Sequence, residues 1–379
     1  MWLPVLALLL VLAALPYLTY IGLRWLLVDG DRPVEPGADR PPVSILVPTY
    51  NEAAIVENTL ERLCSLEYPQ DRLEVVIVDS STDDTAERVR SFFAERATPT
   101  LELVEEETRG GVARAVNAGV EAASHDVIFR TDCDSRLDPS AIERAVETLA
   151  DPAVGAVTGR QADVLGESRV EESYRDLQAG NQALETALDS TFIVHGPCFA
   201  FEREYFEPLS TDSLADDTAI AVAIRKRGKR VVMDPTLLFA EAGTSDIRGR
   251  RLRKDRRAMG LIQVLTRNRD LLGRYGRYGR VVVPFNWFFL VFSPWFSVLI
   301  AAYGVLAVGA TVGIPAAVGV MIAGVGLVGA GHTDRLGPLQ PVYAVVDSQL
   351  SLLVASCRLL AGGGDGTWEV DADSREHLE

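Results

Sequence analysis

Two acidic side chains at a spacing of two follow a short apolar segment of the sequence. Val127, Ile128 and Phe129 are apolar with β-branched character, which predicts a buried strand, and Asp132 and Asp134 come at its carboxyl end. In an extended chain, a spacing of two places both carboxylates on one side. A divalent cation that also binds a phosphate would hold two such charges together. A solvated turn is the alternative, so the neighbouring segments decide between them.

Two earlier segments also combine a strand with a polar loop. Residues 43–47 predict a strand before the loop P-T-Y-N-E (48–52), and residues 73–78 predict a second before D-S-S-T-D-D-T (79–85). A helical pattern follows each loop, which is typical of an α/β protein with a parallel sheet and right-handed crossovers. Ligands of such sheets bind beyond the carboxyl ends of the strands. Both loops and the two aspartates fall at that edge.

A further motif, R-G-G-V-A-R-A-V-N-A-G (109–119), leads through a predicted helix to the strand before Asp132. With P-T-Y-N-E, D-S-S-T-D-D-T and D-C-D in this order, the chain resembles the inverting family 2 glycosyltransferases of the GT-A fold over residues 43–260. The resemblance implies a Rossmann-like, mostly parallel sheet flanked by helices. It also implies transfer of a sugar, with inversion, from a nucleotide-sugar donor.

The resemblance assigns the donor nucleoside to the loops after the first two strands. The residues at these positions are Pro48, Thr49, Asn51, Glu52 and Asp79. Turn formation is the alternative for Asn51, and a solvated role is the alternative for Arg109, which is implied near the donor phosphates. The second loop lacks one position of the commoner V-D-D-G-S-T-D form. That departure makes the identity of the base harder to predict; a UDP-sugar is the first expectation for the donor and a GDP-sugar the second.

The resemblance also implies that Asp132 and Asp134 bind Mg²⁺ or Mn²⁺, with Asp132 contacting the donor as well. Such a cation bridges the diphosphate and neutralises the charge that develops on the leaving group.

An acceptor side is implied by residues 213–231, which are similar to the family's E-D-x-x-L helix and its following R-x-x-G-x-x-V. Asp217 falls on the position that removes the acceptor proton, and Asp216 stands in place of the usual Glu. Helix N-capping is the alternative for one of these acids. His195 and Gly196, expected between two strands, are similar to the acceptor-side loop, although His195 is alternatively a core histidine.

A basic segment follows the predicted domain inside a chain whose net charge is −16. Residues 246–280 hold eleven arginines and one lysine against three aspartates, and we expect them to meet diphosphate and anionic lipid head groups unless they form a solvated face. The overall negative charge argues against nucleic acid as a partner. The segment resembles the Q-x-x-R-W region of processive synthases without its Gln and Trp, which favours a single transfer. Arg256 and Arg257 are the expected diphosphate contacts.

Long apolar segments at both ends predict a multi-pass protein of the plasma membrane. Arginines flank these segments, which predicts a cytoplasmic catalytic domain. The composition, acidic and poor in lysine, is typical of adaptation to high salt. The expected organisation is a membrane anchor at 1–28, a linker at 29–42, the GT-A domain at 43–245, a basic juxtamembrane helical region at 246–280, a transmembrane hairpin at 281–331, an interfacial helix or further span at 338–361, and a polar tail at 362–379.

We therefore predict a membrane-anchored glycosyltransferase with a lipid-linked acceptor, such as a polyprenyl phosphate or a lipid-linked glycan. A polysaccharide synthase is the alternative within the class. A nucleotide-sugar-binding protein without catalysis is the alternative outside it, and it would have no need of a base at Asp217. A transporter fits least, because few spans remain beyond the anchor.

Overall fold

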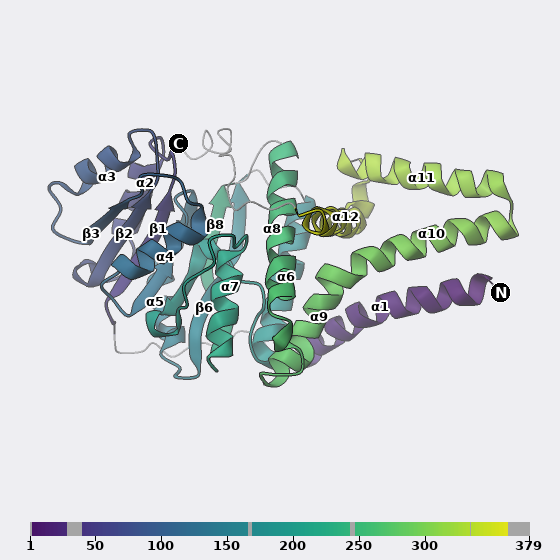
Figure 1. Cartoon of the computed structure of the whole chain (residues 1–379), viewed down its shortest axis with the longest axis horizontal. Helices are drawn as coiled ribbons and strands as arrows, with labels where there is room; N and C mark the ends of the chain where they lie inside the picture. The colour runs from purple at the N-terminus through teal and green to yellow at the C-terminus, as the bar shows by residue number, and fades with distance from the viewer. Residues whose placement is uncertain (1, 29–39, 166–168, 243–246, 334, 363–379) are drawn as a thin grey trace.

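The protein combines a mixed α/β sheet, flanked by helices, with a set of long apolar helices that extend from one side of it (Figure 1). The computed structural model describes residues 2–28, 40–165, 169–242, 247–333 and 335–362. Its helices are α1 Trp2–Leu27, α2 Val56–Cys64, α3 Thr85–Phe93, α4 Val112–Ala122, α5 Ala141–Leu149, α6 Arg169–Leu188, α7 Asp216–Lys226, α8 Ile247–Arg267, α9 Val283–Trp287, α10 Ser293–Thr311, α11 Ile314–His332 and α12 Gln340–Leu360.

The sheet has eight strands in the order β3-β2-β1-β4-β7-β6-β8-β5. The strands are β1 Val43–Thr49, β2 Leu73–Asp79, β3 Thr100–Glu105, β4 Val127–Arg130, β5 Ser135–Leu137, β6 Val154–Leu165, β7 Phe199–Glu202 and β8 Arg230–Ala242. β1 pairs in parallel with β2 and β4, and β2 with β3, whereas β7 runs antiparallel to β4 and β6. The predicted α/β class is confirmed, and the sheet is mixed.

Both faces of the central strands are covered by helices, which explains why most of their side chains are apolar. Ile45 and Val47 of β1 belong to a core cluster with residues of α2, α3 and α5, whereas Leu46 belongs to a second cluster with residues of α4 and α7. Successive side chains of a strand point to opposite faces, so one strand supplies both clusters. These two layers hold the carboxyl ends of β1, β2 and β4 rigidly beside one another.

The last residues of the motif at 109–119 determine how α4 packs on its neighbours. Gly119 of α4 lies so close to Leu46 that a Cβ at this position would overlap the leucine side chain. Asn117 donates from Nδ2 to the carbonyl of Leu209 (2.9 Å) and accepts from its N–H at Oδ1 (2.8 Å). The glycine therefore brings α4 close to β1, and the asparagine fixes the segment that precedes α7.

Four helical stretches among the described residues are long and apolar enough to cross a membrane: 2–27, 278–311, 314–332 and 343–360. Large apolar side chains on α1, α10 and α11 remain exposed, among them Leu8 (57%) and Ile322 (67%). An apolar surface of this extent requires a lipid environment, so the chain is associated with a membrane. Figure 1 shows these three helices lengthwise beside one another and α12 nearly end-on across their base.

A buried carboxylate joins the sheet domain to the apolar helices. Glu185 of α6 accepts from the hydroxyl of Tyr20 in α1 and from Nδ2 of Asn286 in α9, each at 2.7 Å. Its other oxygen accepts from the Thr191 hydroxyl (3.1 Å) and the Phe192 N–H (2.8 Å). Four donors satisfy both oxygens, as burial of a charge requires. Glu185 therefore attaches the sheet domain to the first and second apolar stretches at one point.

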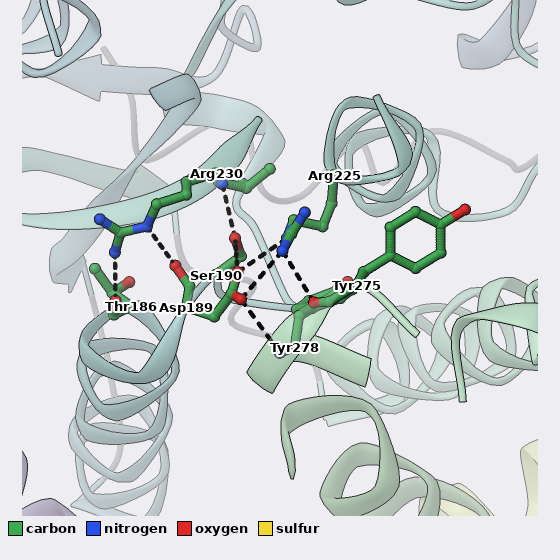
Figure 2. Close-up of polar contacts among 8 residues, drawn as sticks. Thr186, Asp189, Ser190, Arg225, Arg230, Tyr275 and Tyr278 are labelled. Carbon is green, nitrogen blue, oxygen red and sulfur yellow. Dashed lines mark hydrogen bonds and ion pairs between the residues drawn. The ribbon is translucent and has the colours of Figure 1, made fainter. Parts of the chain in front are cut away.

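A second polar junction lies at the end of α6 (Figure 2). Both oxygens of Asp189 accept from the Arg225 guanidinium (2.9 and 3.1 Å), and one also accepts from the Tyr278 N–H (3.4 Å). Arg225 donates further to the Tyr275 carbonyl (2.9 Å), and Arg230 donates to the Asp189 carbonyl (2.7 Å). One buried ion pair thus connects α6, α7, β8 and the start of the second apolar stretch.

Asp189→Ala should lower the free energy of unfolding by about 3 kcal/mol, because it leaves the Arg225 guanidinium buried without its carboxylate. Asp270→Ala is the matched control, since its ion pair with Lys226 is largely exposed and should contribute less than about 1 kcal/mol. Denaturant unfolding in detergent micelles measures both. Equal losses in the two variants would contradict the assignment.

Candidate active site

The loops that follow β1 and β2 are held together by side-chain hydrogen bonds. The buried carboxylate of Asp79 accepts from the hydroxyls of Thr49 (2.7 Å) and Ser81 (2.6 Å). Ser81 in turn accepts from the N–H of Asn51 (2.7 Å), whose Oδ1 accepts from the N–H of Thr82 (2.8 Å). Because β1 and β2 are parallel and Thr49 pairs with Asp79, both loops open on one edge. This edge presents acceptor oxygens that match the donors of a nucleoside.

Asn51 has a positive φ of 56°, which asparagine tolerates better than most residues. This conformation turns the chain so that the N–H of Glu52 donates to the Thr85 hydroxyl (2.9 Å). The charge of Glu52 contributes to the raised pKa of Cys133, after burial of that thiol, so Glu52 lies close to the D-x-D turn. Arg109 stacks its guanidinium over the ring of Tyr50, 3.8 Å from the centroid.

The D-x-D turn comes directly after β4 and is fixed through its backbone. The carbonyl of Cys133 accepts from the Thr59 hydroxyl of α2 (2.6 Å), and the carbonyl of Asp132 accepts from the Ser135 N–H (3.2 Å). Burial raises the pKa of the Asp132 carboxyl, the Arg130 guanidinium lowers it, and the charges of Asp134 and Asp216 raise it further. Several acids therefore face one another at this turn, and each makes ionisation of the next costlier.

Arg130, at the end of β4, is the buried cation of this cluster. Its Nη2 lies 3.1 Å from Oδ1 of Asp132 and 3.3 Å from Oδ2 of Asp216, the first residue of α7. Burial lowers the pKa of Arg130, but the charges of the surrounding acids, Asp132 and Asp216 above all, raise it by more. The guanidinium is charged at every relevant pH. It joins the turn after β4 to the start of α7.

Asp217 lies beside this pair, with its carboxylate held by two backbone donors. Oδ2 accepts from the Gly196 N–H (3.0 Å) and Oδ1 from its neighbour Thr218 (2.6 Å). Burial and then the charge of Asp216 raise the pKa of Asp217, whereas Arg130 and Arg257 lower it. A carboxylate with a raised pKa at an open edge is suited to accept a proton.

His195 is buried in a loop that follows α6, and not between two strands as its sequence position predicts. Nδ1 lies 2.9 Å from Nη2 of Arg257, and because a guanidinium only donates, Nδ1 is the acceptor. Nε2 then carries the proton and faces Oε1 of Gln182 at 3.4 Å. Burial and the charge of Arg257 hold the pKa of His195 well below its usual range. This histidine is a neutral support for Arg257.

Helix α8 brings two arginines to the acids. Burial lowers the pKa of Arg256, and the charges of Asp216 and Asp132 oppose this effect. On the facing strand β8, burial raises the pKa of Glu241 to about 7, with Arg257 lowering it and Asp134 and Asp132 raising it. The site thus collects carboxylates from the D-x-D turn, α7 and β8, and guanidiniums from β4 and α8.

The donor atoms present fit a hard divalent cation that is completed by a ligand. Asp132 and Asp134 are carboxylates whose mutual repulsion a cation would relieve. Within the described residues, no three His, Cys, Asp or Glu side chains form a ready-made metal cage. Mg²⁺ and Mn²⁺ sites that use one or two carboxylates together with substrate phosphates need no such cage.

Comparisons with known proteins agree with this geometry. The chain matches the family described as "Glycosyl transferase family 2" over residues 44–209 and the one described as "Glycosyl transferase family group 2" over residues 127–327. The chain is a family 2 glycosyltransferase. The mannosyltransferase PcManGT from Pyrobaculum calidifontis, solved in complex with GDP-Man and Mn²⁺, is 30% identical with a TM-score of 0.78. That likeness covers 95% of this glycosyltransferase and 99% of the solved chain.

Two curated relatives of this glycosyltransferase are poly-beta-1,6-N-acetyl-D-glucosamine synthases. The protein of Staphylococcus aureus (strain COL) is 27% identical over 202 residues, which are 51% of this chain and 48% of the relative. The protein of Staphylococcus epidermidis is 27% identical over 237 residues, 60% of this chain and 56% of the relative. The chain therefore spans about half the length of the curated relatives it matches.

The residues singled out in the sequence fall into two groups in this glycosyltransferase. The first group lies at the carboxyl ends of β1 and β2 and in the loops that follow, with Arg109 over Tyr50: Pro48, Thr49, Asn51, Glu52, Asp79 and Arg109. The second group, here called the acidic centre, is Asp132, Asp134, His195, Gly196, Asp216, Asp217, Arg256 and Arg257. Sequence reasoning missed Arg130 and Glu241. The signal for Arg130 is a charged residue at the end of an apolar strand, where burial demands a partner.

The stability of the glycosyltransferase without divalent cations should depend on Glu241. Its folded-state pKa of about 7 exceeds the ordinary value of 4.5, so between these pH values the folded chain binds a proton that the unfolded chain has lost. The stabilising effect of that proton is present at low pH and is lost as pH rises from 4.5 to 7. Glu241→Gln should therefore raise the thermal midpoint at pH ~8 and change it little at pH ~5.

Thermal unfolding in EDTA-containing buffer at the two pH values measures this difference. The exposed Glu57, whose partner is Arg88 on the surface, provides the control variant Glu57→Gln. If Glu241→Gln and Glu57→Gln respond to pH alike, Glu241 does not carry the excess proton.

Proposed function

We propose that this glycosyltransferase transfers a sugar, with inversion, from a nucleotide-sugar donor to a lipid-linked acceptor at the cytoplasmic surface of the plasma membrane. The observation that carries the proposal is the acidic centre, in which Asp132, Asp216 and Asp217 gather around Arg130 at the carboxyl edge of the sheet. The full-length similarity to a mannosyltransferase solved with GDP-Man and Mn²⁺ makes GDP-mannose the first donor to test, ahead of a UDP-sugar.

The donor would lie along the edge formed by β1, β2 and β4. Acceptor oxygens in the loops that contain Thr49, Asn51 and Asp79 suit the hydroxyls and N–H groups of a nucleoside. Asp132 and Asp134 would hold Mg²⁺ or Mn²⁺, which when bound neutralises the charge on the departing diphosphate. Arg256 and Arg257 of α8 would add positive charge on the same side. These residues orient the donor without themselves forming a covalent bond to the sugar.

Asp217 would act as the base. Its carboxylate is aligned by the Gly196 and Thr218 N–H groups, so one oxygen can accept the proton of an acceptor hydroxyl while the ring carbon is attacked. An attack opposite the leaving diphosphate inverts the anomeric carbon. A protein that only bound nucleotide sugars would have no need of this acid.

The membrane assignment rests on charge as well as on apolar length. Arg274, Arg277 and Arg280 are exposed at the start of the second apolar stretch, and such a bias favours the cytoplasmic side. In α12, Asp347 accepts from Arg251 (2.7 Å) and Lys254 (3.0 Å) of α8. Charged side chains such as these are costly to place inside a bilayer. We assign α12 to the membrane surface, across the base of α1, α10 and α11, where an acceptor head group would reach α8.

The polysaccharide synthase alternative is favoured by the curated poly-beta-1,6-N-acetyl-D-glucosamine synthases. A processive enzyme must hold a growing polymer, which aromatic side chains at the channel mouth would assist. Residues 251–260 of α8 contain no aromatic side chain, and this favours a single transfer. Product length, read by mass spectrometry after incubation with UDP-N-acetylglucosamine or GDP-mannose, separates the two functions.

Asp134→Ala should weaken binding of GDP-mannose in the presence of Mn²⁺ by about 100-fold, because one of the two carboxylates that would anchor the cation is lost. Isothermal titration with and without Mn²⁺ measures the effect. Asp270→Ala removes an exposed acid elsewhere and should leave the affinity unchanged. Metal-dependent binding that survives in Asp134→Ala would place the cation at another site.

Asp217→Asn should retain donor binding and lower the transfer rate to a hydroxyl acceptor by at least about 100-fold, because the proton has no acceptor. A polyprenyl phosphate is already ionised at neutral pH, since the second pKa of a phosphate monoester is about 6, so it needs no base. GDP release by Asp217→Asn, compared between a hydroxyl acceptor and a polyprenyl phosphate, therefore identifies the acceptor class. Full activity toward a hydroxyl acceptor would remove Asp217 from the mechanism.

A further inference from the structure

Arg130 touches two acids that belong to different halves of the site. Its side chain is 6% exposed, and the same nitrogen, Nη2, lies 3.1 Å from Asp132 and 3.3 Å from Asp216. Asp132 is in the turn after β4, on the side of the cation and the donor. Asp216 begins α7 and is adjacent to the base, Asp217. One planar group therefore spans from the donor side to the base side.

Gly196 provides the space in which this guanidinium lies. A Cβ on Gly196 would overlap Nη1 of Arg130, so any other residue would displace the arginine. The N–H of the same glycine donates to Oδ2 of Asp217 (3.0 Å). Arg130 and Asp217 thus lie against one residue, and a shift of the guanidinium must move the peptide that aligns the base.

We propose that Arg130 is a positioning residue, which fixes the base on α7 relative to the cation-binding turn after β4. The inference rests on the proposed function, because it assigns a role within the transfer reaction. Arg130 contacts the acids and not the sugar, so it acts through them. It also supplies the permanent positive charge that allows several carboxylates to share one edge before a cation or a donor arrives.

The geometry requires an arginine and not merely a positive charge. A guanidinium is a rigid plane with donors on several sides, whereas an ammonium is a point charge on a flexible chain. Among the described residues, Oδ2 of Asp216 is buried without a hydrogen bond, and it forms an ion pair with Arg130. Loss of Arg130 would leave that oxygen buried with its charge poorly compensated.

The first experiment compares Arg130→Gln, Arg130→Lys and the control Arg225→Gln in transfer assays with GDP-mannose, Mn²⁺ and a hydroxyl acceptor. Arg130→Gln should lower kcat by at least about tenfold and change the KM for GDP-mannose by less than about threefold, since misplacement of a base affects the chemical step. It should also move the acid limb of the pH–kcat profile upward, because a nearby positive charge that lowers the pKa of Asp217 is gone. Arg130→Lys should lie between it and the wild type.

Arg225→Gln breaks another buried arginine–aspartate pair, with Asp189, outside the acidic centre. It should lower the thermal midpoint without moving the acid limb. If Arg130→Gln behaves like Arg225→Gln, with a lower midpoint and an unmoved acid limb, Arg130 is structural only and the inference is overturned.

A second experiment requires no sugar transfer. Thermal midpoints in detergent are measured with and without Mn²⁺ alone for the wild type, Arg130→Gln and the double variant Arg130→Gln/Asp216→Asn. Mn²⁺ should raise the midpoint of Arg130→Gln more than that of the wild type, because it replaces the missing charge, and Asp216→Asn should restore part of the lost midpoint.

If Arg130→Gln does not fold, a folded double variant supports the proposed link between Asp132 and Asp216 through Arg130. Equal Mn²⁺ shifts and no recovery, or an unfolded double variant, overturn the inference. A wild type that transfers no sugar disproves the proposed function, while this experiment still decides the role of Arg130.

Discussion

Repulsion between carboxylates is the constraint on which the site depends. Asp132, Asp134, Asp216, Asp217 and Glu241 influence one another electrostatically at a single sheet edge, and burial adds to the cost of ionising them. Such a cluster persists only if cations are built in, because an unpaired charge in a low dielectric is expensive. The chain supplies guanidiniums from β4 and α8. The negative charge that these guanidiniums leave uncompensated is the physical basis of the proposed cation site.

The site depends on the apolar helices because α8, which holds two of its arginines, contacts α12 and leads into the second apolar stretch. Helix α8 follows β8 and leads into the second apolar stretch, and its Asp255 and Lys254 pair with Arg358 and Asp347 of α12. Arginines that face the acidic centre are therefore on the element that also contacts the membrane-associated helices. The Glu185 and Asp189 junctions hold the sheet domain against the same helices at two more points. Any movement of the apolar helices relative to the sheet would therefore displace the α8 arginines of the site.

The sequence allowed much of this arrangement to be predicted, and the exceptions have physical causes. Residues 43–47 and 73–78 are apolar except for Ser44 and Glu74 and are bounded by polar loops, so both strands and their shared edge could be predicted from local pattern. Residues 100–105, in contrast, alternate at an edge with half-buried side chains and were not predicted as β3. Glu241 was missed because its raised pKa comes from burial and from the charges of Asp134 and Asp132, which are distant in sequence and come close to it only through strand pairing. His195 was expected between two strands and lies instead in a loop after α6, where its N–H donates to the Thr158 hydroxyl and its ring contacts Arg257, both distant in sequence.

Gly196 shows that a family motif can be recognised in a sequence before the structural reason for one of its residues is known. In the sequence, H-G-P-C is only a short polar loop, and nothing in it indicates why the second residue lacks a side chain. In the folded chain the missing side chain admits the Arg130 guanidinium, and the backbone N–H of the same residue donates to Asp217. A glycine here is set by the residue that ends β4, far away in sequence. The loop and the strand end should therefore vary together, because a smaller residue in place of Arg130 would remove the reason for a glycine at position 196.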